Sequence, residues 1–150
     1  GFDDMNALYN SIDFCINISS NEGFGLSTLE AMYAGKPIIA LKTGGLTKQV
    51  MNEDGSENGV ALTPEARDLV GSQLVPYIYE DHISNNTVAD AIMKMYKMSP
   101  EERVKLGEFA KENANRKYDF EKVVKEWDKT LTDTIENWKD TYKFWEKITL

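Results

Sequence analysis

Residues 21–45 have the sequence NEGFGLSTLEAMYAGKPIIALKTGG, and this segment predicts a loop, a helix and a strand in that order. The polar start with its two glycines is typical of a loop. Residues 26–34 are mostly good helix formers, and Gly35 followed by Pro37 is a helix-ending signal. The apolar run 37–41 then predicts a buried strand, with the proline at the first position, where the sheet needs no donor.

Shorter elements flank this segment on both sides. Residues 3–12 predict a short helix with acidic residues near its start, and the apolar run 14–18 predicts a buried strand. Downstream, residues 46–51 suit a short helix, and turn dipeptides frame a third, shorter strand at residues 60–62. This alternation of strands and helices predicts an α/β fold whose strands are parallel.

The second half of the chain has a different texture. Residues 63–86 are predicted to form an irregular connection of unusual length. Residues 87–98 then predict a helix, and the sequence SPEE at 99–102 is a strong start signal for another. A last helix is predicted from Asp119 nearly to the end. We therefore predict one domain over residues 1–150, with an α/β part over 1–62, the irregular connection over 63–86 and helices over 87–150.

The last predicted helix carries an apolar stripe with steps of three or four residues. Its members are Phe120, Val124, Trp127, Leu131, Ile135, Trp138, Tyr142 and Trp145. All 3 tryptophans of the chain belong to this stripe. Because a helix of roughly 40 Å is longer than a small domain is wide, Trp138 and Trp145 are expected to cover something other than the sheet.

The composition excludes several classes of function. The 150 residues include 17 Lys+Arg and 25 Asp+Glu, and the net charge of −8 argues against nonspecific binding to nucleic acid or anionic lipid. No apolar run approaches the roughly 18 residues that a transmembrane helix requires. The single cysteine, Cys15, is expected in the core, and its lack of an internal disulfide partner favours a reducing, cytoplasmic location.

The loop before the helix at residues 26–34 has the chemistry of a ligand site. Free backbone N–H groups and the positive dipole end meet at such a helix start, so the backbone at Gly25, Leu26 and Ser27 is a predicted phosphate cradle. Glu30 lies about one turn further on and suits neutral vicinal hydroxyls, on a face shared with Leu26 that we expect to look toward the sheet. Glu22 precedes the helix and suits another part of the same ligand. A molecule with hydroxyls at both ends and phosphate between them is a nucleotide-sugar.

This segment resembles a known family. The glutamates Glu22 and Glu30 with seven residues between them, the sequence AMYAGKPIIA at 31–40 and the pair Gly44-Gly45 resemble the donor half of GT-B glycosyltransferases, most closely the large retaining family numbered four. The similarity covers most of the chain: it continues through residues 54–60 and, weakly after residue 62, through residues 99–106 and 118–120. The resemblance implies a partial Rossmann-like parallel sheet of a GT-B C-terminal domain, with a helical C-terminal half.

The resemblance also implies roles for individual residues. Glu30 would hold the ribose hydroxyls of the nucleotide, and Glu22 would contact the donor sugar near the reacting carbon as the candidate catalytic residue. Backbone amides that contact sugar and diphosphate would come from Gly23, Phe24, Gly25, Leu26 and Ser27. Gly44 and Gly45 are further candidate substrate-binding residues, with a turn role equally open. Such enzymes need no metal or other cofactor, because fixed dipoles stabilise the departing diphosphate.

The chain departs from the family pattern in three respects. Only three strands are predicted where the family's donor domain has six, and the Arg and Lys that would meet the diphosphate belong to the absent portion. The N-terminal acceptor-binding domain is also absent. Lys48 stands where relatives often carry Glu, and we expect it to be a solvated surface residue. The chain is therefore expected to be a fragment or one piece of a split enzyme, inactive alone. Trp138 and Trp145 would then dock on the missing domain or on a partner chain.

The functional prediction is transfer of a hexose from a UDP-, GDP- or ADP-sugar to a hydroxyl acceptor, with retention. One alternative is a non-catalytic nucleotide-sugar-binding or assembly subunit. Another is a different GT-B enzyme, such as a sugar-nucleotide epimerase or a phosphorylase, although nothing marks a lysine for pyridoxal phosphate. The single histidine, His82, lies in an acidic stretch and is expected to be a surface residue rather than a base.

Overall fold

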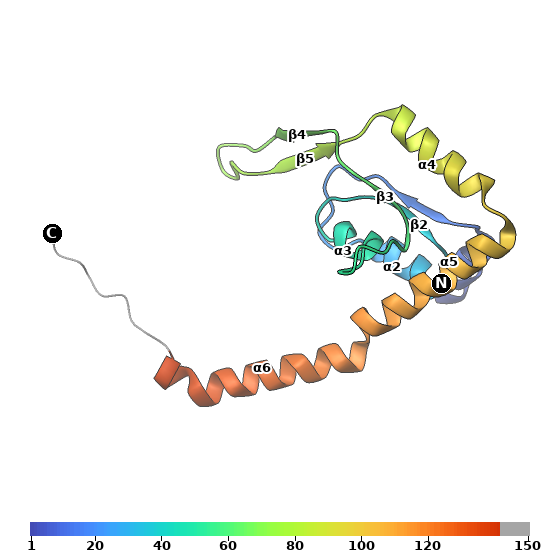
Figure 1. Ribbon diagram of the computed structural model, residues 1–150. Coiled ribbons are helices and arrows are strands. Elements are labelled where there is room, and N and C mark those ends of the chain that lie inside the picture. The colour runs from blue at the N-terminus through green and yellow to red at the C-terminus, as the bar shows by residue number, and fades with distance from the viewer. Residues whose placement is uncertain (142–150) are drawn as a thin grey trace. The chain divides into compact units, whose positions relative to one another are not determined.

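The computed structural model describes residues 1–141, and the chain divides into two compact units, the first over Gly1–Lys117 and the second beginning at Tyr118 (Figure 1). The two units are described separately below. The first unit contains both sheets and the helices that pack on the larger sheet. The second unit is built on one long helix.

The centre of the first unit is a parallel sheet of three strands in the order β1-β2-β3. The middle strand β2 (Ile38–Leu41) pairs in parallel with β1 (Cys15–Asn17) on one side and with β3 (Gly59–Leu62) on the other. Every residue of β2 is buried, as expected for a parallel strand with both faces covered. The predicted α/β fold with parallel strands is confirmed.

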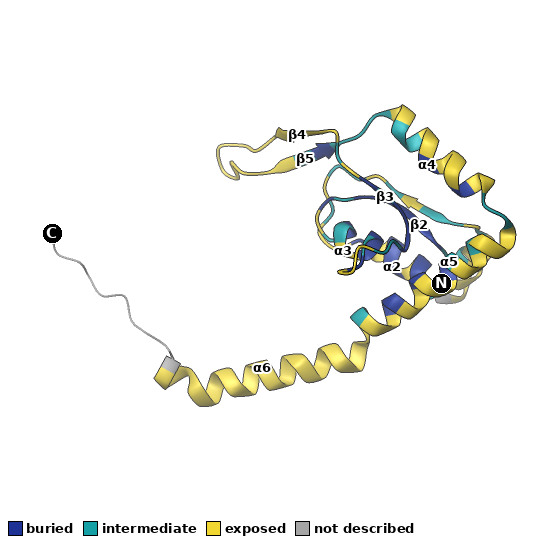
Figure 2. Ribbon diagram, in the orientation of Figure 1, coloured by how far each residue is buried: buried dark blue, intermediate teal, exposed yellow. Residues whose placement is uncertain are grey.

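Helices cover both faces of this sheet. On one face, α4 (Asn85–Lys97) packs its buried Ala91 and Met95 against Ile39 and Leu41 of β2. On the other face lie α2 (Leu26–Tyr33) and α3 (Leu46–Val50), whose inward side chains are also buried (Figures 1 and 2). The remaining helices of the unit are α1 (Phe2–Ser11) and α5 (Pro100–Tyr118).

The start of α5 has the predicted capping box. The backbone N–H of Ser99 donates to Glu102 Oε2 at 2.7 Å, and the N–H of Glu102 donates to Ser99 Oγ at 3.2 Å. Further along α5, the buried Asn113 donates from Nδ2 to Asn58 Oδ1 at 3.0 Å. Asn58 precedes β3 and donates in turn to the carbonyl oxygen of Gln49 on α3, at 2.7 Å. Buried amides therefore join α5 to the start of β3 and, through Asn58, to α3.

The burial predicted for residues 14–18 is wrong. Strand β1 lies at the edge of the sheet, where its one partner among the described residues is β2. The side chains of Ile16 and Ile18 are accordingly 40% and 43% exposed. An apolar, β-branched run is compatible with an interior strand, but burial also depends on what lies beside the strand, which local sequence does not encode.

The connection predicted to be irregular over residues 63–86 contains an antiparallel hairpin instead. Its strands are β4 (Ala66–Leu69) and β5 (Tyr79–His82), and Figure 1 shows them projecting beside the sheet. Residues 70–79, at the far end of the hairpin, carry no charged side chain. They are exposed, and the exposed fraction reaches 93% for Leu74 and 78% for Tyr77.

The second unit is described as far as the end of α6 (Phe120–Thr141). Figure 2 shows this helix exposed along its described length. Among the described members of its stripe, Trp127 is 62% and Ile135 is 72% exposed. Tyr142 and Trp145, predicted to extend the stripe, lie outside the described residues. Across residues 1–141, no helix combines the length and the apolar character needed to cross a membrane.

Candidate functional site

Helix α2 begins at an open glycine turn. Gly25 is its N-cap residue, in the left-handed conformation with φ of 88°, and no side chain among the described residues caps the helix. A Cβ atom at this position would lie 2.5 Å from Leu46 Cδ2 and 2.8 Å from Thr28 Oγ1. The amides of the first helical turn have no acceptor within the helix by geometry. The predicted loop-to-helix junction is therefore present, with free donors at the end of α2 that follows β1.

A buried polar cluster holds this junction in place. Gln49 of α3 is fully buried and donates from Nε2 to the carbonyl oxygen of Phe24 at 2.6 Å. Its Oε1 accepts a short hydrogen bond from the hydroxyl of Thr28, which is also fully buried. The cluster thus connects α3 both to the loop and to the first turn of α2. Sequence reasoning missed Gln49 and Thr28, because a glutamine in a short helix and a threonine in a helix carry no sign of burial.

The loop that follows β2 packs directly on the loop that carries Glu22. Gly45 donates its N–H to the carbonyl oxygen of Glu22 at 3.1 Å. Gly44 has φ of 45°, and a Cβ there would lie 1.9 Å from the same oxygen. A Cβ on Gly45 would lie 2.6 Å from Phe24 Cα. The two glycines therefore serve a close approach of two backbones, and a ligand contact from them stays a prediction.

Glu22 lies on its loop, partly buried, and its carboxylate turns back toward that loop. Its Oε1 accepts from the backbone N–H of Phe24 at 3.4 Å, a long and therefore weak hydrogen bond. Around it, Gly23, Phe24, Leu26 and Ser27 are all exposed. The predicted binding segment is thus at the surface, next to the start of α2.

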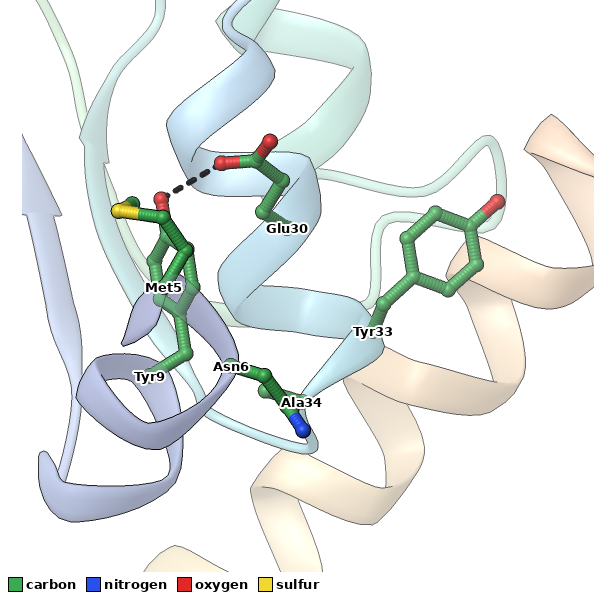
Figure 3. A pocket seen from close by; sticks show the side chains of 6 residues that line it. All are labelled: Met5, Asn6, Tyr9, Glu30, Tyr33 and Ala34. Carbon is green, nitrogen blue, oxygen red and sulfur yellow. Dashed lines mark hydrogen bonds between the residues drawn. The ribbon is translucent and has the colours of Figure 1, made fainter. Parts of the chain in front are cut away.

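Glu30 lies one turn into α2 and is exposed, and its Oε2 accepts a hydrogen bond of 2.8 Å from the hydroxyl of Tyr9 on α1. The two side chains line a hollow of about 270 Å³ between α1 and α2 (Figure 3). The remaining lining residues are Met5, Asn6, Tyr33 and Ala34. Burial, the hydrogen bond to Glu30 and the charge of Glu30 together raise the pKa of Tyr9 to about 12.

The expected orientation of the Glu30 face is wrong. The buried face of α2 consists of Thr28, Leu29, Ala31 and Met32. Leu26, expected to look toward the sheet with Glu30, is 68% exposed. The outward orientation of Glu30 leaves its carboxylate accessible to a ligand. Tyr9 was not predicted as part of the site, because no local signal relates it to a glutamate 21 positions away.

The stem of the hairpin contacts the same loop. The buried carboxylate of Asp81 on β5 accepts two hydrogen bonds from Arg67 on β4, at 2.7 and 3.0 Å. These bonds hold the pKa of Asp81 below its usual range, helped by a hydrogen bond with Thr43. The N–H of Asp81 donates to the carbonyl oxygen of Ser20 at 2.8 Å, and Asn21 Nδ2 donates to that of Tyr79 at 3.2 Å. The hairpin therefore begins beside the loop that carries Glu22.

Lys48 and His82 were both predicted to be surface residues. Lys48 is exposed on α3. His82 is partly exposed on β5, with Nε2 3.2 Å from Asp68 Oδ2 of the neighbouring strand. His82 therefore belongs to the hairpin stem and contacts the hairpin's own carboxylate.

Comparisons with known proteins extend this description. Residues 1–74 match the model of the family described as Glycosyl transferases group 1. A trehalose phosphorylase of Pleurotus sajor-caju is 27% identical over 106 residues, which are 61% of this chain and 14% of that protein. An uncharacterized glycosyltransferase of Methanocaldococcus jannaschii is 31% identical over 96 residues, 61% of this chain and 24% of that protein.

The fold is also similar to a solved structure. Sucrose-phosphate synthase from Thermosynechococcus elongatus superposes with a TM-score of 0.63 at 23% identity, covering 86% of this chain and 27% of that one. This chain therefore spans less than a third of the length of each of these three proteins.

Proposed function

Residues 1–74 match the Glycosyl transferases group 1 family, and from this premise we propose that the chain binds the donor of a retaining glycosyltransferase. Its fold is similar to part of a GT-B glycosyltransferase. In the proposed reaction, a hexose passes from a nucleoside-diphosphate sugar to a hydroxyl of the acceptor. The nucleotide-sugar is a substrate, and the proposal includes neither a metal nor another cofactor.

The observation that carries this proposal is the open first turn of α2 with a carboxylate one turn further along. The amides after Gly25 and the positive dipole end of α2 would accept the diphosphate, whose negative charge grows as the sugar departs. The exposed carboxylate of Glu30 would accept hydrogen bonds from the vicinal ribose hydroxyls. The backbone of residues 23–27 would contact the sugar and the diphosphate.

Glu22 is proposed as the residue that contacts the sugar near the reacting carbon. Its carboxylate lies on the loop that leads into α2, and its present partner is the weak hydrogen bond from Phe24. Because a weak hydrogen bond is readily exchanged for a stronger one to a ligand, Glu22 can turn from its own loop to a sugar hydroxyl without a large loss. Gly44 and Gly45 support this loop from behind.

The proposal is tested by titrating the chain with UDP, GDP, ADP and their glucose conjugates by NMR, which detects weak binding. Glu30→Gln should weaken the preferred nucleotide about tenfold or more, because a hydrogen bond to a charged acceptor is lost. Glu108→Gln, an exposed glutamate of α5, is the matched control and should bind as the wild type does. Binding that ignores Glu30→Gln, or no binding of any of these nucleotides, would refute the proposed donor site.

We further propose that a second domain or a partner chain completes the enzyme and docks on the stripe of α6. The stripe places large apolar side chains, among them Trp127 and Trp138, along one helix. Such a surface is typical of a protein interface. We propose that activity requires this second domain or partner chain and that the enzyme is cytoplasmic. Trp138→Ala should weaken the association of this chain with that domain or partner. Unchanged association would contradict this role of the helix.

The similarity to trehalose phosphorylase makes phosphorolysis the second candidate function. In that reaction inorganic phosphate takes the sugar, so the phosphate cradle at α2 would hold phosphate or a sugar phosphate in place of a diphosphate. The same NMR titration separates the two candidates. Preference for glucose 1-phosphate and inorganic phosphate over every nucleotide would favour phosphorolysis, whereas preference for a nucleoside diphosphate favours the transferase.

A further inference from the structure

We propose that Tyr9 is a positioning residue, which holds the Glu30 carboxylate in the orientation that recognises the ribose hydroxyls of the donor. This inference rests on the proposed function, because it assigns a second residue to the ribose contact of the same site. Tyr9 belongs to α1 and Glu30 to α2, so the contact joins two helices that are separated by the loop and by β1. Figure 3 shows the two side chains meeting at one end of the hollow between those helices.

The hydrogen bond divides the two oxygens of the carboxylate between two tasks. Oε2 accepts from the hydroxyl of Tyr9 at 2.8 Å, a normal length for a bond between a hydroxyl and a carboxylate. Each carboxylate oxygen offers more than one lone pair, and Oε1 is a second acceptor on the same group. A pair of vicinal hydroxyls needs two acceptor positions at a set angle. With Oε2 held by Tyr9, rotation of the carboxylate is limited and its open acceptor positions have a defined direction.

Without Tyr9, nothing in the helix itself would restrict the side chain of Glu30. Glutamate has several rotatable bonds, and an exposed glutamate on a helix exchanges among rotamers freely. A ligand that binds such a side chain must first order it, and ordering lowers affinity. A side chain already ordered by a neighbour avoids that loss. Tyr9 is partly buried, so its own ring is restricted by packing before it meets Glu30.

The proton of this hydrogen bond stays on Tyr9 under ordinary conditions. Burial and the neighbouring carboxylate raise the pKa of Tyr9 to about 12, so its hydroxyl remains a donor near neutral pH. Tyr9 is therefore the donor of this hydrogen bond and Glu30 the acceptor. A phenylalanine at position 9 would keep the ring and remove only the donor.

The decisive measurement is the ratio of dissociation constants for a 2′-deoxynucleoside diphosphate and its ribose counterpart, using UDP, ADP and GDP as probes. We expect the wild-type chain to discriminate about tenfold or more for the preferred base, because a hydrogen bond to a charged acceptor is lost. Tyr9→Phe should reduce that ratio at least about threefold, on the same reasoning for a mispositioned acceptor. Tyr96→Phe, on the exposed side of α4, is the matched control and should keep the wild-type ratio.

A ratio has an advantage over an affinity, because general loosening of the fold weakens both ligands alike. The double variant of Tyr9→Phe with Glu30→Gln should discriminate no less than Glu30→Gln alone, since Tyr9 acts through Glu30. If Glu30→Gln abolishes discrimination but Tyr9→Phe keeps the wild-type ratio, the positioning role is overturned and the donor site stands. If the wild-type chain binds no nucleotide, or binds both sugars equally, the ribose role of Glu30 fails and the role of Tyr9 fails with it.

A second measurement needs no ligand and tests the contact itself. The chemical shift of a Tyr9 ring carbon, followed by NMR as the pH is raised, reports the ionisation of the hydroxyl. It should give a pKa of about 12 in the wild type. In Glu30→Gln the value should fall, because the charge and the charged acceptor have gone. An unchanged value would show that the hydroxyl has no contact with Glu30 in solution, and the positioning role would be overturned on that ground alone.

Discussion

Gly44 lies so close to Glu22 that a Cβ atom added to it would stand 1.9 Å from the carbonyl oxygen of Glu22. The two residues belong to the loops that follow β2 and β1, and the N–H of Gly45 donates to that same oxygen. The position of the Glu22 loop is therefore set from behind by another loop. A side chain added at Gly44 must therefore displace Glu22.

Gly44→Ala should destabilise the chain and disturb the Glu22 loop. The substitution adds a left-handed backbone strain and a backbone clash, together costing about 2–4 kcal/mol. Gly55→Ala is the matched control, because Gly55 also has a positive φ, of 82°, but nothing lies within 4 Å of its added Cβ. We expect the control to cost about 1 kcal/mol, from backbone strain alone. Urea unfolding measures both values, and equal losses would contradict the close approach.

The buried hydrogen bonds of Gln49 predict a non-additive pair of substitutions. Gln49→Leu leaves the carbonyl oxygen of Phe24 and the hydroxyl of Thr28 without their side-chain partner, which should cost about 1–3 kcal/mol. Thr28→Val removes the other partner of the hydrogen bond between Thr28 and Gln49, so the double variant loses that shared bond only once; the Thr28 hydroxyl also lies 2.8 Å from the carbonyl oxygen of Gly25. The double variant should therefore lose less stability than the sum of the single losses. Strictly additive unfolding free energies would show that the two side chains do not share a bond.

The hairpin stem should lose stability in acid. Arg67 and Thr43 lower the pKa of Asp81 in the folded chain, so folding favours the charged carboxylate. This contribution is complete above the ordinary pKa of about 3.9 and is lost as pH falls through the lower folded value. Asp81→Asn should remove this part of the acid dependence. Hydrogen exchange at the β4–β5 amides, compared between pH 5 and pH 3, provides the measurement; an acid response in Asp81→Asn equal to that of the wild type would count against it.

Tyr9 should make the opposite contribution in alkali. Its pKa rises to about 12 in the folded chain, whereas an unfolded tyrosine titrates near 10. The contribution is complete below about pH 10 and declines as pH rises toward the folded value. Tyr9→Phe should therefore flatten the fall in unfolding free energy between about pH 10 and pH 12. If the unfolding free energy of the variant fell with pH as steeply as that of the wild type, folding would not raise the pKa of Tyr9.

Local patterns sufficed for those parts of the fold where pattern and burial coincide. The apolar run at β2 and the capping box at Ser99 each contain their own signal, and both elements are present. The hairpin gave no such signal, because β4 is exposed on every residue and has no buried face to produce an alternation. The burial of β1 was wrong for a related reason, since it depends on neighbours that the strand itself does not specify.

The candidate site divides in the same way. The glutamates, the glycine turn and the helix start are consecutive in the chain, so their spacing suffices to predict one site. Tyr9 and Gln49 reach that site from other helices, at 21 positions from Glu30 and Thr28 respectively. Their roles arise from packing, and a single sequence offers no means to pair them.

The steric environment of Gly25 also limits how this chain can diverge. At many helix starts, a serine, asparagine or aspartate at the N-cap position accepts a hydrogen bond from a first-turn N–H group. Here such a residue would drive its side chain into Leu46 and Thr28 at a φ of 88°. A capping side chain at position 25 is therefore excluded as long as the contact with Leu46 is kept. In related sequences that keep this contact, the first-turn amides of α2 should remain without a side-chain cap, whether or not they bind a ligand.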